Sequence, residues 1–308
     1  MTQGIVVLFV VTLITFGLQH LLPGGPARAV LGPRADPAHI AAFNRQHGLD
    51  QPLVVQYVDY LRDLAHVDLG FSYKLNQSVD SLLGERLPKT LILTSFGIAL
   101  AVLLGIPLGL VEALRRNSLA DYVLTTVSFV FYAMPIFFLA LLLLLFFAID
   151  VPLFPPEASQ GTSISDLLSQ PAGLVLPIVA LALWNLALFS RYMRSSVIDT
   201  LTQDFITMAR SKGLNEQTIV IRHVIRNSLL PIVTLLGLNL PGIVAGTLIV
   251  EAVFNYPGMG LLFWNAATTD DYPVELGVVL VTGLATVAGS LLADIGYAFL
   301  DPRVTYSA

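Results

Sequence analysis

The chain has 308 residues, of which 55% are hydrophobic and 12% are charged, and its mean hydropathy is +0.77. This composition excludes an ordinary soluble domain and is typical of a protein whose helices lie in lipid. The absence of Cys excludes disulfides, thiolate metal sites and a Cys nucleophile, and the dispersed basic residues of a chain with net charge −5 provide no nucleic-acid footprint.

Six stretches without Asp, Glu, Lys or Arg are each long enough to cross a membrane, because a helix needs about 20 residues to cross a hydrocarbon core of ~30 Å. They are 1–27, 90–111, 122–149, 167–190, 227–250 and 276–293. The sequence therefore predicts an all-α membrane protein with about six transmembrane helices. We expect a first transmembrane helix at 1–22, an external helical subdomain at 23–88, a membrane core at 89–300 and a tail at 301–308.

The first stretch also has one feature of a signal peptide, since Ala27 and Ala29 form a small-x-small pattern after an apolar run. However, no basic region precedes the run, and the run exceeds the usual apolar length of ~7–15 residues. We therefore interpret the first stretch as a transmembrane helix. Either interpretation places the residues that follow it on the outer side.

The segment 23–88 contains seven acidic and six basic residues. Loops longer than ~60 residues are translocated largely regardless of charge, so this segment is predicted to be external. Within it, apolar and aromatic residues recur at helical spacing after Pro52, which predicts an amphipathic helix. These residues are Leu53, Tyr57, Tyr60, Leu61 and Leu64. The helix is expected either to pack on the membrane domain of its own chain or to contact an external partner.

The distribution of Lys and Arg predicts which of the remaining loops face the cytoplasm, because positive charge is retained on that side. Basic residues follow the second stretch at Arg115 and Arg116, occur six times within 191–227, and follow the sixth stretch at Arg303. The loops 150–171 and 251–272 contain acidic residues but no Lys or Arg. These two loops are predicted to be external, which places both termini in the cytoplasm.

The cytoplasmic loop 191–227 has a pattern of helix, break and helix rather than that of a flexible linker. Apolar residues at helical spacing predict a helix over 199–210, Gly213 interrupts the pattern, and a second apolar series begins at Ile219. Glycine at such a break lets the chain turn where a side chain would obstruct it. A pair of short helices in the cytosol is predicted to be a docking surface.

The run Asp204-Phe-Ile-Thr-Met-Ala-Arg-Ser-Lys-Gly-Leu214, followed by Arg222-His223 and Arg226-Asn-Ser-Leu-Leu-Pro231, resembles the coupling loop of ABC-importer permeases of the dipeptide and oligopeptide permease family. The resemblance implies a short helix that inserts into a groove on the ATP-hydrolysing subunit. It assigns this coupling role to Asp204, Thr207, Met208, Ala209, Arg210, Lys212, Gly213 and Leu214. The wider pattern Glu-Ala-Ala-x-x-x-Gly is matched only at Ala209 and Gly213, so the fit to a particular ATPase stays open.

Other motifs extend the resemblance over nearly the whole chain. They are Leu21-Leu-Pro-Gly-Gly-Pro26, His47-Gly-Leu-Asp-Gln-Pro-Leu53, Glu251-Ala-Val-Phe-Asn-Tyr-Pro-Gly-Met-Gly260, Asp271-Tyr-Pro273 and Leu300-Asp-Pro-Arg303. The family usually has basic residues before the first helix, which this sequence lacks, and Asp270 occupies a position where a basic residue is common. The family implies that 89–300 is a permease core whose coupling loop is 191–227.

The resemblance implies a permease subunit that forms half of the translocation pathway of an ATP-driven importer for dipeptides or short oligopeptides, in the cytoplasmic (inner) membrane of a prokaryote. The implied partners are a second homologous permease subunit, two ATP-binding subunits, an external substrate-binding protein, the peptide and membrane lipid. Two alternatives stay open. One is a self-sufficient secondary carrier or channel, and the other is the same type of importer carrying nickel chelates or glutathione.

The chain lacks the phosphate-binding pattern Gly-x-x-x-x-Gly-Lys-Ser/Thr. The closest segment, Gly84 to Thr90, has Pro88 where the pattern requires Gly before Lys89. Catalytic elbows and paired metal-ligand His residues are also absent from the sequence. We therefore expect a transport subunit that is not an enzyme and holds no cofactor of its own, with ATP and Mg bound by its partner subunits.

The sequence leaves the substrate pathway unassigned. Charged residues near the ends of the expected spans are interpreted as loop or helix-end residues; they are Glu251, Glu275 and Asp294. Other residues interrupt the spans or place polarity and bulk inside them; they are Pro107, Pro135, Pro177, Trp184, Asn185, Asn239 and Pro241. Such residues fit a translocation path that rearranges, and they fit simple packing equally well.

Overall fold

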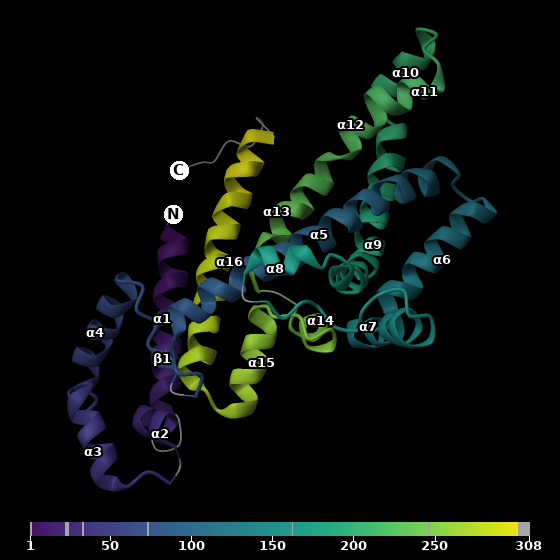
Figure 1. Cartoon of the computed structure of the whole chain (residues 1–308). Helices are drawn as coiled ribbons and strands as arrows, with labels where there is room; N and C mark the ends of the chain where they lie inside the picture. Colours follow the sequence, from purple (N-terminus) through teal and green to yellow (C-terminus); the bar gives the residue numbers. More distant parts are fainter. Residues whose placement is uncertain are drawn as a thin grey trace.

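The computed structural model describes residues 2–21, 25–32, 34–72, 74–161, 163–245 and 247–300. Helices make up most of this part of the chain (Figure 1). One antiparallel ladder pairs β1 (Phe71–Ser72) with β2 (Gln77–Ser78). The prediction of an all-α membrane protein is confirmed.

The N-terminal helices are α1 (Thr2–Leu21), α2 (Gly25–Leu31), α3 (Pro37–Gln46) and α4 (Leu53–Ala65). The predicted amphipathic helix is α4, which begins directly after Pro52. The rings of Tyr57 and Tyr60 lie 5.2 and 5.7 Å from the ring of Phe16 on α1, and the hydroxyls of Tyr57 and Thr12 are hydrogen-bonded at 3.0 Å. One face of α4 therefore packs on α1 of its own chain.

Two long helices, α5 (Val79–Leu114) and α9 (Ala172–Leu201), form the centre of the molecule. α5 begins ten residues ahead of the core boundary expected at residue 89. Its glycines let the two backbones approach closely: a Cβ on Gly109 would lie 2.3 Å from the carbonyl oxygen of Ser190, and a Cβ on Gly105 would lie 2.8 Å from Cβ of Phe189. In lipid, small residues at a helix interface allow this kind of close packing.

The third expected span is bent. It consists of α6 (Leu119–Ala133) and α7 (Ile136–Leu144), the latter continued by the π-helix η1 (Leu145–Asp150), and the chain bends by 101° between its two halves. The break falls at Pro135, which has no N–H to donate and disfavours helical backbone at the residue before it. Met134 is accordingly extended, with ψ 132°.

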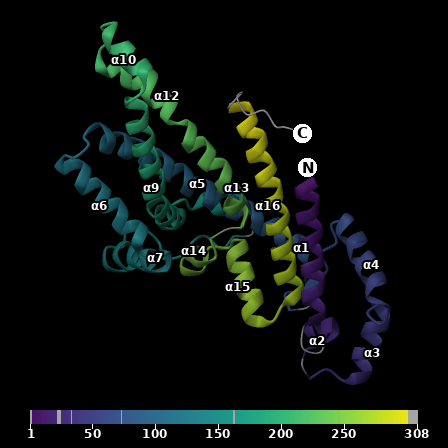
Figure 2. The ribbon, with the colours of Figure 1, turned by 180° about the vertical axis from the view of Figure 1, so that it is seen from behind.

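The remaining helices lie outside this central group or flank it. They are α8 (Ile164–Ser169), α10 (Asp204–Ser211), α11 (Glu216–Ile219), the π-helix η2 (Val220–Val224), α12 (Ile225–Ser228), α13 (Leu230–Ala245), α14 (Leu248–Val253), α15 (Met259–Thr269) and α16 (Tyr272–Leu300). α13 packs on α16, and α16 in turn packs on α1. Figures 1 and 2 show that α3 and α4 lie at one end of an elongated molecule and α10 and α11 at the other.

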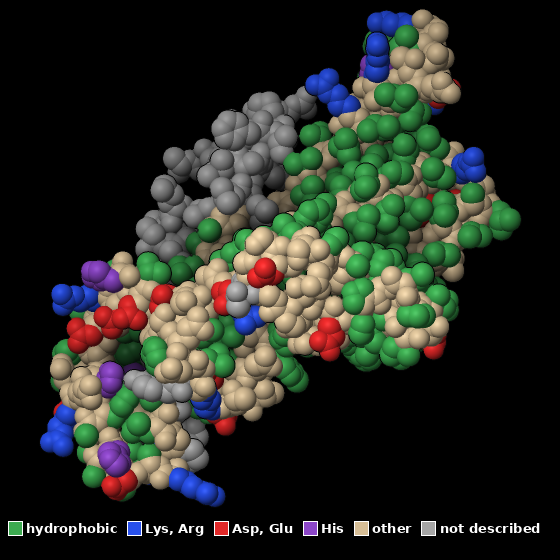
Figure 3. Space-filling view, in the orientation of Figure 1, with side chains coloured by type: hydrophobic (Ala, Val, Ile, Leu, Met, Phe, Trp, Pro, Cys, Tyr) green, Lys and Arg blue, Asp and Glu red, His purple; other side chains and the backbone are tan. Residues whose placement is uncertain are grey.

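Within the described residues, four helices are long and apolar enough to cross a membrane, or five if the bent pair counts as one span. The four are Val79–Leu114, Ala172–Leu201, Glu216–Gly237 and Tyr272–Ser290. α1 lies within the first expected stretch, and its described apolar portion is Phe9–Leu18. The expected number of six therefore stays a prediction. Figure 3 shows hydrophobic side chains over the middle of the molecule, with Lys and Arg at the α10 tip.

Candidate functional site

The loop predicted to couple the chain to an ATPase forms the far tip of the molecule (Figure 1). We call residues 204–214 the tip segment. The helix expected over 199–210 is divided: α9 ends at Leu201, the backbone of Gln203 is extended, and α10 occupies Asp204–Ser211. The predicted break at Gly213 is present, since Gly213 has φ +77° and therefore lies in the left-handed region.

Local hydrogen bonds fix the turn that follows α10. The amide of Gly213 donates to the carbonyl of Arg210 (2.9 Å), and the amide of Leu214 donates to the carbonyl of Ala209 (3.3 Å). Asn215 then caps α11, because its side chain accepts a hydrogen bond from the amide of Thr218 at 2.7 Å. The turn is thus a defined structure rather than a loose connection.

One face of α10 is buried against the helices that carry it. Ile206 is fully buried and Ala209 is 7% exposed, and both belong to a cluster with Val197 of α9, Ile219 of α11 and Val224 of η2. Burial of apolar side chains from four elements joins the tip segment firmly to the end of α9.

The opposite face of the tip segment leaves apolar side chains exposed. Phe205, Met208 and Leu214 are 40%, 55% and 42% exposed. A group of exposed apolar side chains on a projecting element is a feature of a protein contact surface. One face of α10 is thus packed against its own chain, and the other leaves apolar side chains exposed.

Polar residues surround this apolar patch. Arg210 donates from Nε and Nη2 to the two carboxylate oxygens of Glu216 at 2.8 and 3.2 Å, and this hydrogen-bonded pairing raises the pKa of Arg210. Asp204 lies in the first turn of α10, where a negative charge is favourable, and Thr207 and Lys212 are exposed. All eight residues assigned to coupling by the resemblance are thus together in one segment; their role stays a prediction.

A second constellation was not predicted from the sequence. Glu251 of α14, interpreted above as a loop or helix-end residue, is completely buried. Its carboxylate accepts hydrogen bonds from the hydroxyl of Thr90 (2.9 Å) and the amide of Leu261 (3.0 Å), and the same hydroxyl accepts from the amide of Met259 (2.8 Å). A buried carboxylate must be satisfied in this way.

The glycines of the motif that follows Glu251 are explained by this arrangement. A Cβ on Gly258 would lie 2.5 Å from both Oε2 of Glu251 and Oγ1 of Thr90, and a Cβ on Gly260 would lie 2.5 Å from Cα of Leu248. Only glycine leaves room for the carboxylate. The combination of Glu251 with Pro-Gly-x-Gly shortly after it is the sequence signal that points to this site.

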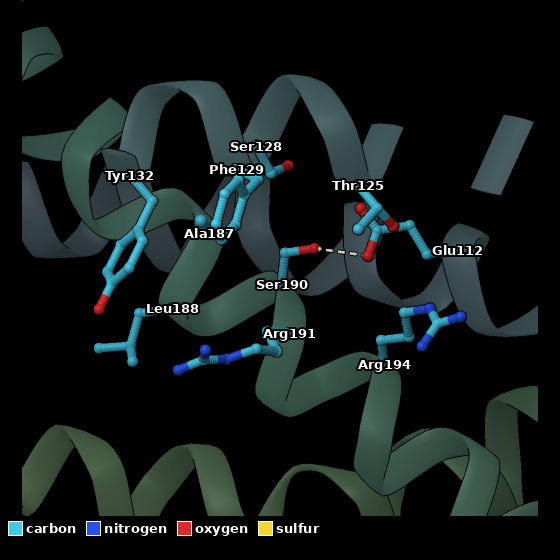
Figure 4. Close-up of a pocket in the computed structure, with 10 residues that line it drawn as sticks. All are labelled: Glu112, Thr125, Ser128, Phe129, Tyr132, Ala187, Leu188, Ser190, Arg191 and Arg194. Carbon is cyan, nitrogen blue, oxygen red and sulfur yellow. Dashed lines mark hydrogen bonds between the residues drawn. The ribbon is translucent and has the colours of Figure 1, made fainter. Parts of the chain in front are cut away.

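Two cavities lie against α9, and neither was predicted from the sequence. The first, drawn in Figure 4, has a volume of about 220 Å³ and lies between α5, α6 and α9. We call it the Glu112 cavity. The second has a volume of about 370 Å³ and includes Trp184 and Asn185, two of the residues noted within the spans. We call it the Trp184 cavity. The side chains of Asn239, Pro241 and Asp294 lie outside the described residues.

Arg194, which lines the Glu112 cavity, is held in an ion pair. Arg194 of α9 donates from Nε and Nη2 to the two carboxylate oxygens of Asp121 of α6, both at 3.0 Å. Bidentate pairs of this kind are geometrically specific and strong. Within the described part of the chain, no group of three His, Asp or Glu side chains is placed to hold a metal ion.

Comparison with known proteins identifies the family. The profile described as "Binding-protein-dependent transport system inner membrane component" matches residues 105–306, and that of the N-terminal membrane component of the same systems matches residues 1–94. The chain belongs to this family. It is therefore a permease component of an ABC importer, and the resemblance seen in the sequence is confirmed.

Named relatives match this permease over almost its whole length. A putative peptide permease protein of Brucella ovis is 39% identical, with 98% of this chain and 96% of the relative covered. The oligopeptide transport system permease protein AppB of Bacillus subtilis is 34% identical (99% and 97% covered). The dipeptide transport system permease protein DppB of Alkalihalophilus pseudofirmus is 32% identical (97% and 96% covered).

Proposed function

We propose that this chain forms half of the translocation pathway of an ATP-driven importer for dipeptides or short oligopeptides, and that separate ATP-hydrolysing subunits move it through the tip segment. The names of the relatives from Bacillus subtilis and Alkalihalophilus pseudofirmus support the peptide substrate. The observation that carries the coupling role is the two-faced α10, with Ile206 buried and Met208 55% exposed.

The way in which α10 is supported makes it suitable for transmitting force. α9 is a helix of 30 residues, about 45 Å long at 1.5 Å per residue, and it reaches from the bilayer to the tip segment. Ile206 and Ala209 connect α10 to Val197 at the end of this helix and to Val224 on the returning arm. A displacement of α10 by an ATPase would therefore move α9 and the returning arm together, which is how rigid-body motion switches access from one side to the other.

The proposed assembly contains two permease chains, this one and a homologous subunit, within membrane lipid. Two ATP-binding subunits hold ATP and Mg, and an external substrate-binding protein delivers the peptide to the outer opening. This chain contributes the pathway and the docking surface. No nucleic acid takes part.

Co-purification tests the proposal against a self-sufficient carrier or channel. A tagged chain, expressed from its native gene neighbourhood and purified in mild detergent, should recover an ATPase in a one-to-one ratio of ATPase to permease chains. Uptake in liposomes should then require ATP inside the vesicle. Ion-driven peptide uptake by this chain alone would contradict the proposal.

The substrate class is tested on the binding protein of the same complex. We expect the purified binding protein to carry a short peptide, identified by mass spectrometry of the released ligand. A nickel chelate or glutathione in its place would keep the importer and replace the substrate.

The orientation is tested with a thiol reagent that does not cross membranes. The chain has no Cys, so Ser211→Cys on α10 and Ser165→Cys on α8 each introduce a single thiol. We expect Ser211→Cys to react only from the cytoplasmic side and Ser165→Cys only from the outside. Labelling of Ser211→Cys from the outside would contradict the proposed coupling.

A further inference from the structure

Glu112 is a buried acidic residue of α5 whose hydrogen-bonding capacity is only half used. The residue is 2% exposed, and its Oε2 accepts a hydrogen bond from the hydroxyl of Ser190 at 2.9 Å. Its other oxygen, Oε1, is buried without any partner in the described structure. A carboxylate in or near a bilayer is costly, and such residues commonly mark a binding site or a pathway.

A second unsatisfied group lies on the other wall of the same cavity. Ser128 of α6 is 4% exposed, and its hydroxyl has no hydrogen-bond partner among the described residues. Figure 4 shows Ser128, Thr125 and Glu112 around the Glu112 cavity, with Ser190 hydrogen-bonded to Glu112. Two buried polar groups without partners in one cavity indicate a ligand that supplies hydrogen bonds.

The neighbouring cations are directed elsewhere. Nε and Nη2 of Arg194 donate to Asp121, and the guanidinium of Arg191 lies over aromatic rings, 5.9 Å from the ring centre of Tyr132 and 6.0 Å from that of Tyr192. The free oxygen of Glu112 therefore lacks a cation in hydrogen-bond contact. An ammonium group is a suitable occupant, because it brings a positive charge and three donors.

The Glu112 cavity is the second of two cavities in series along α9. Trp184 lines the first cavity in this series, and Leu188 and Arg191 line the second. These three residues of α9 are spaced by four and three positions, so they lie on one face of the helix. From residue 184 to residue 191 the helix rises about 10 Å toward the tip segment. On α5 the order is the same, since Thr94 lines the Trp184 cavity and Glu112 the other.

We propose that the Glu112 cavity is a subsite in the cytoplasmic half of the translocation pathway and that it binds the free α-ammonium group of a peptide in transit, through Glu112 and Ser128. This inference rests on the peptide-import function proposed above. The ammonium group is common to unmodified peptides whatever their side chains, so a site that recognises it serves many sequences. Arg191, on the same face of α9, is placed to attract the carboxylate end of a short peptide.

Cysteine protection tests the proposal in the complete transporter. In inside-out vesicles that contain the whole complex, Ser128→Cys is labelled with a membrane-impermeant maleimide, and the labelled permease chain is separated by gel. At ten times its dissociation constant, the dipeptide Ala-Ala should slow labelling about tenfold. N-acetyl-Ala-Ala, which lacks the ammonium group, should not slow it at the same concentration.

Three further variants make the result specific. Glu112→Gln combined with Ser128→Cys should weaken protection by Ala-Ala about tenfold to a hundredfold, because a charge-assisted hydrogen bond is lost. Thr125→Cys, on the same wall, provides a second reporter if Ser128→Cys fails to fold. Ser195→Cys, exposed on α9 and outside the cavity, should be labelled at the same rate with and without peptide.

The failure of this inference can be distinguished from failure of the proposed function. ATP-dependent uptake of Ala-Ala by the wild-type complex, without protection of Ser128→Cys or Thr125→Cys, would overturn the subsite and leave the importer intact. Equal protection by Ala-Ala and its N-acetyl form would overturn the ammonium assignment. Protection that depends on phosphatidylethanolamine in the vesicles, and not on peptide, would assign the cavity to a lipid and overturn the proposal. No uptake of any peptide would remove the basis of both proposals.

Discussion

Thr90 on α5 and Glu251 on α14 are joined by a buried hydrogen bond of 2.9 Å although 161 residues separate them in the chain. The hydroxyl of Thr90 also accepts a hydrogen bond from the amide of Met259 at 2.8 Å, so one side chain satisfies two groups. These contacts join α5 to α14 and to the first residue of α15. It places a polar anchor inside a largely apolar molecule.

We predict that Thr90→Val lowers the free energy of unfolding by about 1–3 kcal/mol, because the amide of Met259 and the carboxylate of Glu251 each lose a partner where water is excluded. Thr90→Ser keeps the hydroxyl and should cost clearly less. Thermal unfolding of the purified chain in detergent measures both variants. Equal losses for Val and Ser would contradict the prediction, because Thr90→Ser keeps the hydroxyl that makes both hydrogen bonds and Thr90→Val removes it.

A pH titration tests the packing of α4 on α1. Burial against α1, together with the nearby hydroxyl of Tyr57, raises the pKa of Tyr60 to about 12, whereas an unfolded Tyr titrates near 10. Because the folded pKa is raised, the stabilising contribution of neutral Tyr60 is complete below about pH 10 and is lost as the pH rises toward 12. An ultraviolet difference titration of wild type against Tyr60→Phe should show a tyrosinate midpoint near 12. A midpoint near 10 would mean that Tyr60 is exposed to water.

Features determined by local chemistry were predictable from the sequence. Pro52 ahead of an amphipathic series predicted α4, and Gly213 between two apolar series predicted the turn after α10. Both depend on backbone preferences within a few residues. The exact limits of α10 were not predictable. Nothing in the apolar pattern of 199–210 indicates that the backbone becomes extended at Gln203 and separates α10 from α9.

Features that depend on partners far away in the sequence were not predicted, because a local pattern does not show which residues meet in the folded chain. The sequence predicts Glu251 to be a loop or helix-end residue near an interface, whereas hydrogen bonds from Thr90, far away in the sequence, and from the amide of Leu261 satisfy its carboxylate inside the molecule. Glu112 lies just beyond the uncharged stretch 90–111, so its sequence position suggests an interface residue. In the folded chain, Glu112 accepts a hydrogen bond from Ser190 of α9, and the sequence alone does not show that these two residues are neighbours.

Gly213 and Gly84 form a matched pair for testing the turn after α10. A Cβ on either glycine would meet no heavy atom within 4 Å, but Gly213 has φ +77° whereas Gly84 lies within α5 and its φ is not positive. We predict that Gly213→Ala costs about 1–2 kcal/mol of backbone strain and lowers ATP hydrolysis coupled to the loaded binding protein. Gly84→Ala should be neutral or stabilising by about 0.5–1 kcal/mol.

A second substitution at Gly213 tests whether the left-handed backbone of the turn is the cause of the loss. Gly213→Asn should recover part of the lost coupled hydrolysis, because Asn tolerates left-handed backbone better than Ala does. Coupled hydrolysis is measured on the whole complex in lipid. If Ala and Asn behave alike at position 213, the backbone conformation of the turn is not what limits coupling.

The two faces of α10 predict opposite outcomes for one chemical change. Ile206 is fully buried and Met208 is 55% exposed, two residues apart on the same short helix. Ile206→Asp places an unpaired charge in the cluster with Val197 and Ile219, and should destabilise the tip segment by more than about 3 kcal/mol. Met208→Asp should change stability by no more than about 0.5 kcal/mol, because its side chain points to solvent.

The functional readout separates docking from folding. Met208→Asp should fold and insert normally yet reduce recovery of the ATPase in co-purification tenfold or more, since an exposed apolar contact is replaced by a charge that must be desolvated. Val54→Asp, on the 76% exposed side chain of α4 at the other end of the molecule, is the matched control and should leave recovery unchanged. Full recovery of the ATPase with Met208→Asp would mean that the partner does not grip this face, because the substitution places a full charge at the centre of the apolar patch formed by Phe205, Met208 and Leu214.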